Sequence, residues 1–203
     1  MTTKPKTTAK RTTNKVKTLH PATLVALPPN PFAFEVFDLV IKQRTKAKKI
    51  EYLKKYGHPS IKSLFIWNFD NSVISLLPPG EVPYSSLEEE QNTTGTLSTR
   101  IEQQTATMGY NNTNSIGTSD DLTRGRTSIR KEFKKFYNFV KGGNDKLKSL
   151  SRETMFIQIL QGLHPLEAEI LCLVKDKKLT DKYKITKEVV SAAYPQITWG
   201  GRS

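Results

Sequence analysis

The sequence predicts an all-α protein: a compact bundle of about six to eight short helices, interrupted by a long flexible insert and preceded by a disordered basic arm. Three observations predict this architecture. Apolar residues recur at helical spacing in residues 32–84 and 124–195. Residues 1–20 contain too few large apolar side chains to form a core, and a proline-rich stretch follows them up to Pro31. Residues 85–123 lack periodic hydrophobicity. We therefore expect one helical domain formed by 32–84 and 124–195, with 196–203 as a tail.

Residues 1–31 are expected to form the arm. The first twenty residues hold six basic side chains and no acidic one, and they consist mostly of Thr, Lys, Ala, Asn and Pro. Such a segment cannot bury enough apolar surface to offset an ordering entropy of about 1–2 kcal/mol per residue. The prolines between Pro21 and Pro31 fix φ and remove backbone donors, which predicts an extended joint to the first helix.

The first half of the domain is predicted to contain three helices, of which the first two are either separate or continuous. The first, near residues 32–44, carries one apolar stripe of Phe34, Phe37, Val40 and Ile41. The second runs from about Thr45, a plausible N-cap, to Tyr56 and is rich in lysine. Its inward side is expected to carry Ala47, Ile50 and Leu53. The third starts at Pro59, a favoured residue of a first helical turn.

Two connecting segments follow. Residues 70–84 combine prolines with large apolar residues, which predicts an ordered loop packed on the core. Residues 85–123 are rich in Ser, Thr, Asn, Gln, Gly and Glu. Because a structureless loop of this length is uncommon inside a compact domain, we expect this insert to be disordered or to become ordered against a partner.

The second half of the domain begins with a strong amphipathic helix. Its apolar side is predicted to carry Ile129, Phe133, Phe136, Tyr137 and Val140. A short helix is expected over residues 144–150, and Ser151 is expected to cap the next helix, which ends at Gly162. Pro165 opens a further helix. Thr186 caps the last one, which stops before Pro195.

The formal net charge of +13 is distributed unevenly along the chain. Net charges are +6 for residues 1–20, +4 for 21–60, −6 for 61–123 and +9 for 124–203. Basic terminal arms commonly contact polyanions, so the arm is a candidate for binding nucleic acid or a partner through Lys4, Lys6, Lys10, Arg11, Lys15 and Lys17. A solubilising tail is the alternative.

The aromatic helix of the second half is also basic. Its candidate phosphate-binding residues are Arg124, Arg126, Arg130, Lys131, Lys134 and Lys135. Contacts to phosphate position a protein without reading the base sequence, so we expect no base specificity. The alternative is a solvated polar face above an aromatic core stripe.

No catalytic or metal site is predicted, so we expect a protein that is not an enzyme and has no cofactor. His20, His58 and His164 lack a ligand partner at i+4 and any His-x-His pattern, which favours roles in turns. Cys172, the single cysteine, lies on an apolar helix and is expected to be a buried, inert thiol. Because the chain has a single cysteine, it cannot form an intrachain disulfide. The carboxylate of Glu167 in a first helical turn is explained by the helix dipole.

Several binding modes are disfavoured. The loop Lys141-Gly142-Gly143-Asn144 lacks the spacing of a phosphate-binding loop and any preceding strand. A helix-turn-helix over residues 151–178 would present Glu167 and Glu169 to DNA, which argues against docking in the major groove. No apolar run approaches the roughly 18 residues that span a bilayer. The basic N-terminus lacks the apolar stretch of a signal peptide.

Three segments resemble a known protein family: LLPPGEVPY (76–84), FYNFVKGGNDKL (136–147) and ETMFIQILQGLHPLEAEILCLVKDKKL (153–179). They are similar to a family of small uncharacterised proteins of large contractile-tailed, myovirus-type bacteriophages, especially phages of marine bacteria and cyanobacteria. The resemblance covers roughly residues 36–84 and 124–195, and the arm and most of the insert depart from it. It implies a phage gene product made in the cytoplasm of the bacterial host, and no activity or catalytic residue.

Two functions are therefore expected from the sequence. The first is a non-enzymatic phage accessory protein that associates through its basic segments with nucleic acid or a nucleoprotein complex, by non-specific phosphate contacts. The alternative is a structural component of the virion, in which the arm and the insert become ordered against neighbouring subunits. Neither function involves a membrane.

Overall fold

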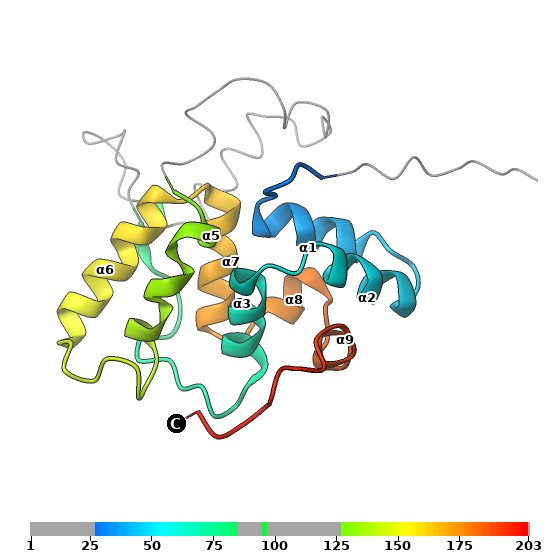
Figure 1. The fold of residues 1–203 in the computed structure, drawn as a ribbon. Coiled ribbons are helices and arrows are strands. Elements are labelled where there is room, and N and C mark those ends of the chain that lie inside the picture. Colours follow the sequence, from blue (N-terminus) through cyan, green and yellow to red (C-terminus); the bar gives the residue numbers. More distant parts are fainter. Residues whose placement is uncertain (1–26, 85–94, 97–126, 203) are drawn as a thin grey trace, which may run out of the picture.

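The computed structural model describes residues 27–84, 95–96 and 127–202, and it confirms the all-α fold (Figure 1). Its helices are α1 (Ala33–Ile41), α2 (Lys46–Lys55), α3 (Pro59–Phe69), α5 (Ile129–Glu132), the 3-10 helix η1 (Phe133–Phe139), α6 (Ser149–Gly162), α7 (Pro165–Lys175), α8 (Leu179–Tyr183) and α9 (Lys187–Ala193). Two strands of two residues each, β1 (Pro83–Tyr84) and β2 (Gly95–Thr96), pair antiparallel. The predicted arm up to residue 26 and nearly all of the predicted insert lie outside the described residues.

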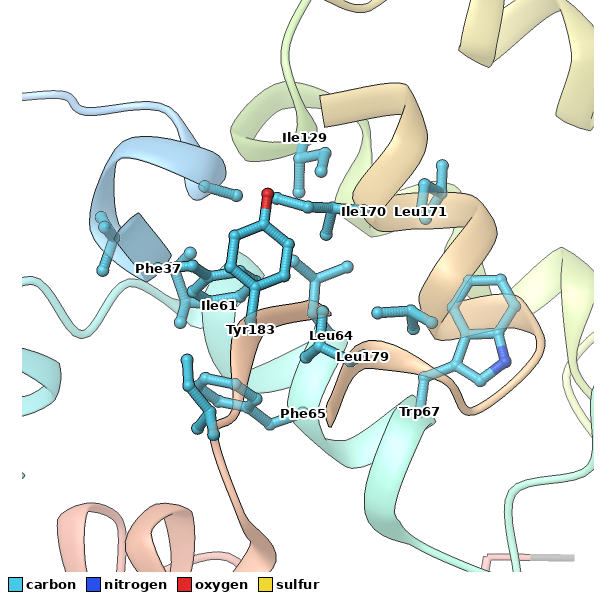
Figure 2. Close-up of a cluster of buried hydrophobic side chains, with 14 of the residues drawn as sticks. Phe37, Ile61, Leu64, Phe65, Trp67, Ile129, Ile170, Leu171, Leu179 and Tyr183 are labelled. Atoms are coloured by element: carbon cyan, nitrogen blue, oxygen red, sulfur yellow. The ribbon is translucent and has the colours of Figure 1, made fainter. Parts of the chain in front are cut away.

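The core lies where α1, α3, α7 and α8 meet. Figure 2 shows Phe37, Leu64, Ile170 and Tyr183, one from each of these helices, gathered around a common centre. The four side chains are at most 2% exposed. Full burial of an apolar side chain of this size stabilises a protein by about 1.5–3 kcal/mol relative to an exposed one. None of the described helices is both long and apolar enough to cross a membrane.

The three predicted helices of the first half are confirmed, and local signals start two of them. Thr45 Oγ1 accepts a hydrogen bond from Lys48 N (3.3 Å) at the start of α2. At the start of α3, His58 Nδ1 accepts from Ser60 N (3.1 Å), next to Pro59. The prediction that Ala47 faces inward is wrong: Ala47 is exposed.

Tyr52 is buried on α2 in place of Ala47. The reason is that α2 packs against both α1 and α9, so its buried side is set by two neighbours rather than one. Tyr194, which follows α9, packs so closely on this region that a Cβ added to Gly57 would lie 3.0 Å from its ring. Helical periodicity predicts one buried stripe on α2, so it could not predict the second contact, with α9 and Tyr194.

The predicted amphipathic helix after Thr127 is only partly correct. One turn of α-helix, α5, continues as the 3-10 helix η1. A 3-10 helix has three residues per turn, so side chains at i and i+3 eclipse each other. Phe136 and Phe139 are therefore buried, and Phe133 packs partly against the core on the same side. Tyr137, which was expected to face the core, is 54% exposed.

The short helix predicted over residues 144–150 is absent; residues 141–147 form turns, and α6 begins at Ser149 instead of after a Ser151 cap. Arg152, which is 6% exposed, instead holds these turns through their backbone oxygens. Its guanidinium donates to the carbonyl oxygens of Asn138 (2.7 Å), Asn144 (3.0 Å) and Leu147 (3.0 Å).

The remaining predicted helices are confirmed: α6 ends at Gly162, α7 opens at Pro165 and α9 follows Thr186. The short helix α8 was not predicted. Leu179 and Tyr183 of α8 are buried, and Leu179 N donates to Asn68 Oδ1 (3.1 Å). A helix of five residues is too short to show a periodic pattern.

The loop of residues 70–82 is ordered against the core, as predicted. Val73 and Leu77 are each 7% exposed. Backbone hydrogen bonds join the loop to the end of η1, from Leu76 N to Phe139 O (2.8 Å) and from Lys141 N to Ile74 O (2.9 Å).

Candidate nucleic-acid interface

Four of the twelve basic residues predicted to bind nucleic acid or a partner are among the described residues. They are Arg130, Lys131, Lys134 and Lys135, on α5 and η1. The other eight lie outside the described residues: Lys4, Lys6, Lys10, Arg11, Lys15, Lys17, Arg124 and Arg126. The structure does describe where the segments that carry these eight join the fold. We call residues 27–31 the arm junction and residues 127–130 the insert junction.

The two junctions lie at the same end of the domain (Figure 1). Arg130 Nη2 donates a hydrogen bond to Pro31 O (3.3 Å), which links the insert junction directly to the arm junction. Thr127 N donates to Gly162 O (2.8 Å), at the C-terminal end of α6. Two basic segments that are about a hundred residues apart in the chain therefore start from neighbouring points (99 residues separate Pro31 and Arg130).

The carboxylate of Glu167 holds the first residues of α1 and α5 together beside these junctions. Its Oε1 accepts from Ala33 N (3.0 Å) and its Oε2 accepts from Ile129 N (2.8 Å). Glu167 is 1% exposed. Its burial raises the pKa to about 7; the two backbone hydrogen bonds and the charge of Arg130 lower it, and the nearby charge of Glu35 raises it. One side chain of α7 therefore fixes the helices that follow the arm and the insert.

Arg130 is directed toward the arm junction and is half-buried. Burial lowers the pKa of its guanidinium, and the charge of Glu167 opposes that shift. The structure thus gives Arg130 a structural contact that the sequence pattern did not indicate.

Two exposed cations of α5 and η1 lie in a row with an exposed tyrosine. Lys131, Lys134 and Tyr137 are exposed and follow each other at intervals of three residues. Lys134 and Tyr137 both belong to η1, where the 3-10 geometry brings residues i and i+3 into line. Lys135 lies outside this row, and its Nζ is 2.7 Å from Glu132 Oε2. The ion pairs of the described residues include neither Lys131 nor Lys134.

A second basic surface, on α2, was not among the predicted binding residues. Residues 42–55 contain seven basic side chains and one acidic one, Glu51. The lysines at positions 46, 48, 54 and 55 are exposed, and no lysine of α2 is among the ion-paired side chains of residues 27–84 and 127–202. This surface adjoins the arm junction, because Leu27 N donates to the hydroxyl of Tyr56 (3.2 Å), the C-cap of α2. The charge of +4 on residues 21–60 was the signal that could have identified it.

The histidines and the cysteine have structural surroundings. His164 Nδ1 accepts from Leu166 N (3.1 Å) at the start of α7, its ring stacks on Phe34 (4.7 Å between centroids), and burial lowers its pKa to about 4. Cys172 is partly buried, and burial raises the pKa of its thiol to about 12. Within the described residues, no group of three or more His, Cys, Asp or Glu side chains is placed to hold a metal ion. His20 lies outside the described residues.

Comparison with known protein families identifies a match. The model of a family of unknown function (DUF6433) matches residues 36–111 and 107–181. The two matched segments meet within the insert and together extend from α1 into α8. The arm lies outside both segments. No curated protein and no solved structure matches the chain.

Proposed function

We propose that this chain, which belongs to the DUF6433 family of unknown function, is a non-enzymatic accessory protein that associates through its basic segments with nucleic acid or a nucleoprotein complex. The observation that carries the proposal is the meeting of the arm junction and the insert junction, joined by the hydrogen bond from Arg130 to Pro31. We further propose that it acts in the bacterial cytoplasm during phage infection, which the resemblance of three of its segments to proteins of contractile-tailed phages supports.

The arrangement of charge supports a polyanion as the partner. The arm contributes six basic side chains, and it leaves the fold beside the basic surface of α2. The insert returns through Arg124 and Arg126 to the row that contains Lys131 and Lys134. Three basic elements thus adjoin one end of the domain, so they can follow one phosphate backbone. Neutralisation of many phosphates releases counterions and makes affinity depend steeply on salt.

A charge-matched pair of variants tests the proposal. Lys10→Gln, Arg11→Gln and Lys15→Gln in the full chain remove three positive charges from the arm. The control removes three from the opposite end of α6 and α7, with Lys146→Gln, Lys148→Gln and Lys178→Gln. Lys148 precedes α6, whose length of 14 residues corresponds to roughly 20 Å of separation from Gly162 and the insert junction.

Binding of a fluorescein-labelled 20-base-pair DNA is measured by anisotropy at low salt. We expect the arm variant to bind at least about tenfold more weakly than the control variant. The arm variant loses three phosphate contacts, whereas the control loses three charges that lie far from the DNA. Equal losses in the two variants would show that net charge alone is responsible. Absence of binding by the unmodified chain would refute the proposal as a whole.

A structural role in the virion is the second candidate function. The resemblance to phage proteins favours it, together with two long segments that start from one end of the domain and would gain buried surface from neighbouring subunits. Quantitative mass spectrometry of purified particles separates the two functions. Many copies per particle favour the virion role, and absence from particles favours the intracellular one.

A further inference from the structure

A groove of about 260 Å³ lies between α3, η1 and the turn that follows η1. Its lining includes Trp67, Val73, Phe136 and Tyr137, with Lys141 and Arg202 as cations. The walls are therefore mainly apolar and aromatic. Of the two cations, Arg202 is paired with Asp70 and Lys141 is exposed. We propose that this groove binds an unpaired base of single-stranded nucleic acid, stacked on Tyr137; this inference rests on the proposed function.

Tyr137 presents an aromatic ring to solvent beside the groove. It is 54% exposed, although the neighbouring aromatic residues Phe136 and Phe139 are buried. The backbone that carries the ring is closely packed, because Gly143 lies directly on the backbone of Tyr137, where a Cβ would be 1.9 Å from the carbonyl oxygen. The turn after η1 is held to the loop of residues 70–82, because Lys141 N donates a hydrogen bond to Ile74 O (2.9 Å). A ring held in this way is a platform on which a base can stack.

The charges around the groove favour an anionic occupant. Lys134 lies one turn of η1 before Tyr137, and Lys141 follows shortly after; both are exposed. The nearby carboxylates are already engaged. Asp70 pairs with Arg202 and accepts hydrogen bonds from Gly200 and Ser72, and Asp145 accepts from Gly142 N (3.0 Å). Phosphate groups on both sides of a stacked base would meet the two lysines.

Trp67 supplies a donor that has no acceptor. Its side chain is in the wall of the groove and is 3% exposed, and its Nε1 has no hydrogen-bond partner among the described residues. Figure 2 shows this nitrogen on the edge of the ring that is turned away from the packed cluster. A buried N–H group without a partner is destabilising. The nitrogen is itself buried, so a base in the groove would contact the exposed ring of Tyr137 and not this donor.

An unpaired base fits these observations better than a duplex does. In a duplex the flat faces of the bases are covered by their neighbours, so an exposed tyrosine ring has nothing to stack on. Single-strand binding proteins combine cations along the backbone with aromatic platforms that tolerate any base. The groove provides both features, and it lies on the same row of exposed residues as the candidate phosphate contacts Lys131 and Lys134.

The test compares a labelled twenty-nucleotide oligothymidine with the 20-base-pair duplex, using the full chain. Tyr137→Ala is expected to weaken binding of the single strand at least about fivefold, as expected for loss of one stacked base. Its affinity for the duplex should not change, and the salt dependence should stay the same because no charge is removed. Tyr137→Phe keeps the ring and should bind like the unmodified chain. Leu150→Ala, at a residue that is 76% exposed on α6, is the control for removal of an exposed apolar side chain.

Circular dichroism of each variant verifies folding. Equal single-strand affinity for Tyr137→Ala and the unmodified chain would overturn the inference, as would an equal loss on single strand and duplex. Either result would leave the proposed function intact, provided that the unmodified chain binds DNA. If the unmodified chain binds neither probe, the proposed function fails and the inference fails with it.

Discussion

The buried carboxyl of Glu167 is expected to make the domain less stable as the pH rises, which is the reverse of the usual effect of a carboxylate in an ion pair. Burial raises its pKa from 4.5 to about 7. Between these two values the folded state holds a proton that the unfolded state has released. The stabilisation is therefore complete below pH 4.5 and is lost as the pH rises through 7.

The size of the effect follows from the shift. One pKa unit corresponds to 1.36 kcal/mol, and proton linkage with a folded pKa of about 7 gives a loss of about 1.3 kcal/mol between pH 6 and pH 8. His164 acts in the opposite direction, because burial lowers its pKa from 6.5 to about 4. Its contribution is present above pH 6.5 and is lost as the pH falls toward 4. A variant at Glu167 is therefore needed to isolate the effect of the carboxyl.

The assay is urea unfolding of the unmodified chain and Glu167→Gln at pH 6, 7 and 8, followed by circular dichroism. Both proteins contain His164, so its contribution cancels in the difference between their free energies of unfolding. We expect the stability of the unmodified chain, relative to that of Glu167→Gln, to fall by about 1.3 kcal/mol from pH 6 to pH 8. A constant difference would refute the reasoning. An increase with pH would mean that the hydrogen bonds from Ala33 and Ile129 outweigh the cost of burial.

Three further predictions concern stability and reactivity. Gly143→Ala should lower the free energy of unfolding by about 1–3 kcal/mol in urea titrations, because the new methyl group would lie 1.9 Å from a backbone oxygen. Gly162→Ala should destabilise the domain less, because its new methyl group would meet only another methyl group, at 3.1 Å. Equal destabilisation by the two substitutions would contradict the steric reason. Cys172 should resist maleimide at pH 8 until the chain is unfolded, because burial raises its pKa to about 12; fast labelling of the folded protein would show an exposed thiolate. Burial alone would raise the pKa of Asp70. Hydrogen bonds from Gly200, Ser72 and Arg202 outweigh this effect and lower the pKa from 3.8 to about 2. Its stabilisation is therefore present above pH 3.8 and is lost as the pH falls toward 2, so Asp70→Asn should be about 2 kcal/mol less stable at pH 7 and approach the unmodified chain in acid.

Most helix starts and stops could be predicted because their signals are local. Pro59 and Pro165 open α3 and α7, and Gly162 ends α6. The change from α5 to η1 could not be predicted in this way, because Phe133, Phe136 and Val140 fit an α-helical stripe. The observed 3-10 stripe of Phe133, Phe136 and Phe139 shares two of these three residues. The early start of α6 depends on Arg152, whose guanidinium reaches carbonyl oxygens up to 14 residues away.

The candidate site was predictable in its charge and not in its arrangement. The charge of the basic arm and of the row on α5 and η1 could be predicted by counting basic and acidic residues along the chain. The same count could have identified the basic surface on α2. The link between the first residues of α1 and α5 depends on Glu167, which the sequence explains equally well as a dipole-favoured residue of a first helical turn. Its partner Ala33 is 134 residues away, and no local pattern indicates a contact over that distance.

The salt dependence of DNA binding by the unmodified full chain tests the central claim most directly. Equilibrium constants for the 20-base-pair duplex are measured from 50 to 300 mM NaCl. If the six cations of the arm alone contact phosphates, the plot of log K against log salt has a slope of about −5, and contacts from α2 or η1 make it steeper. A slope near zero, or no binding at 50 mM, would contradict the account.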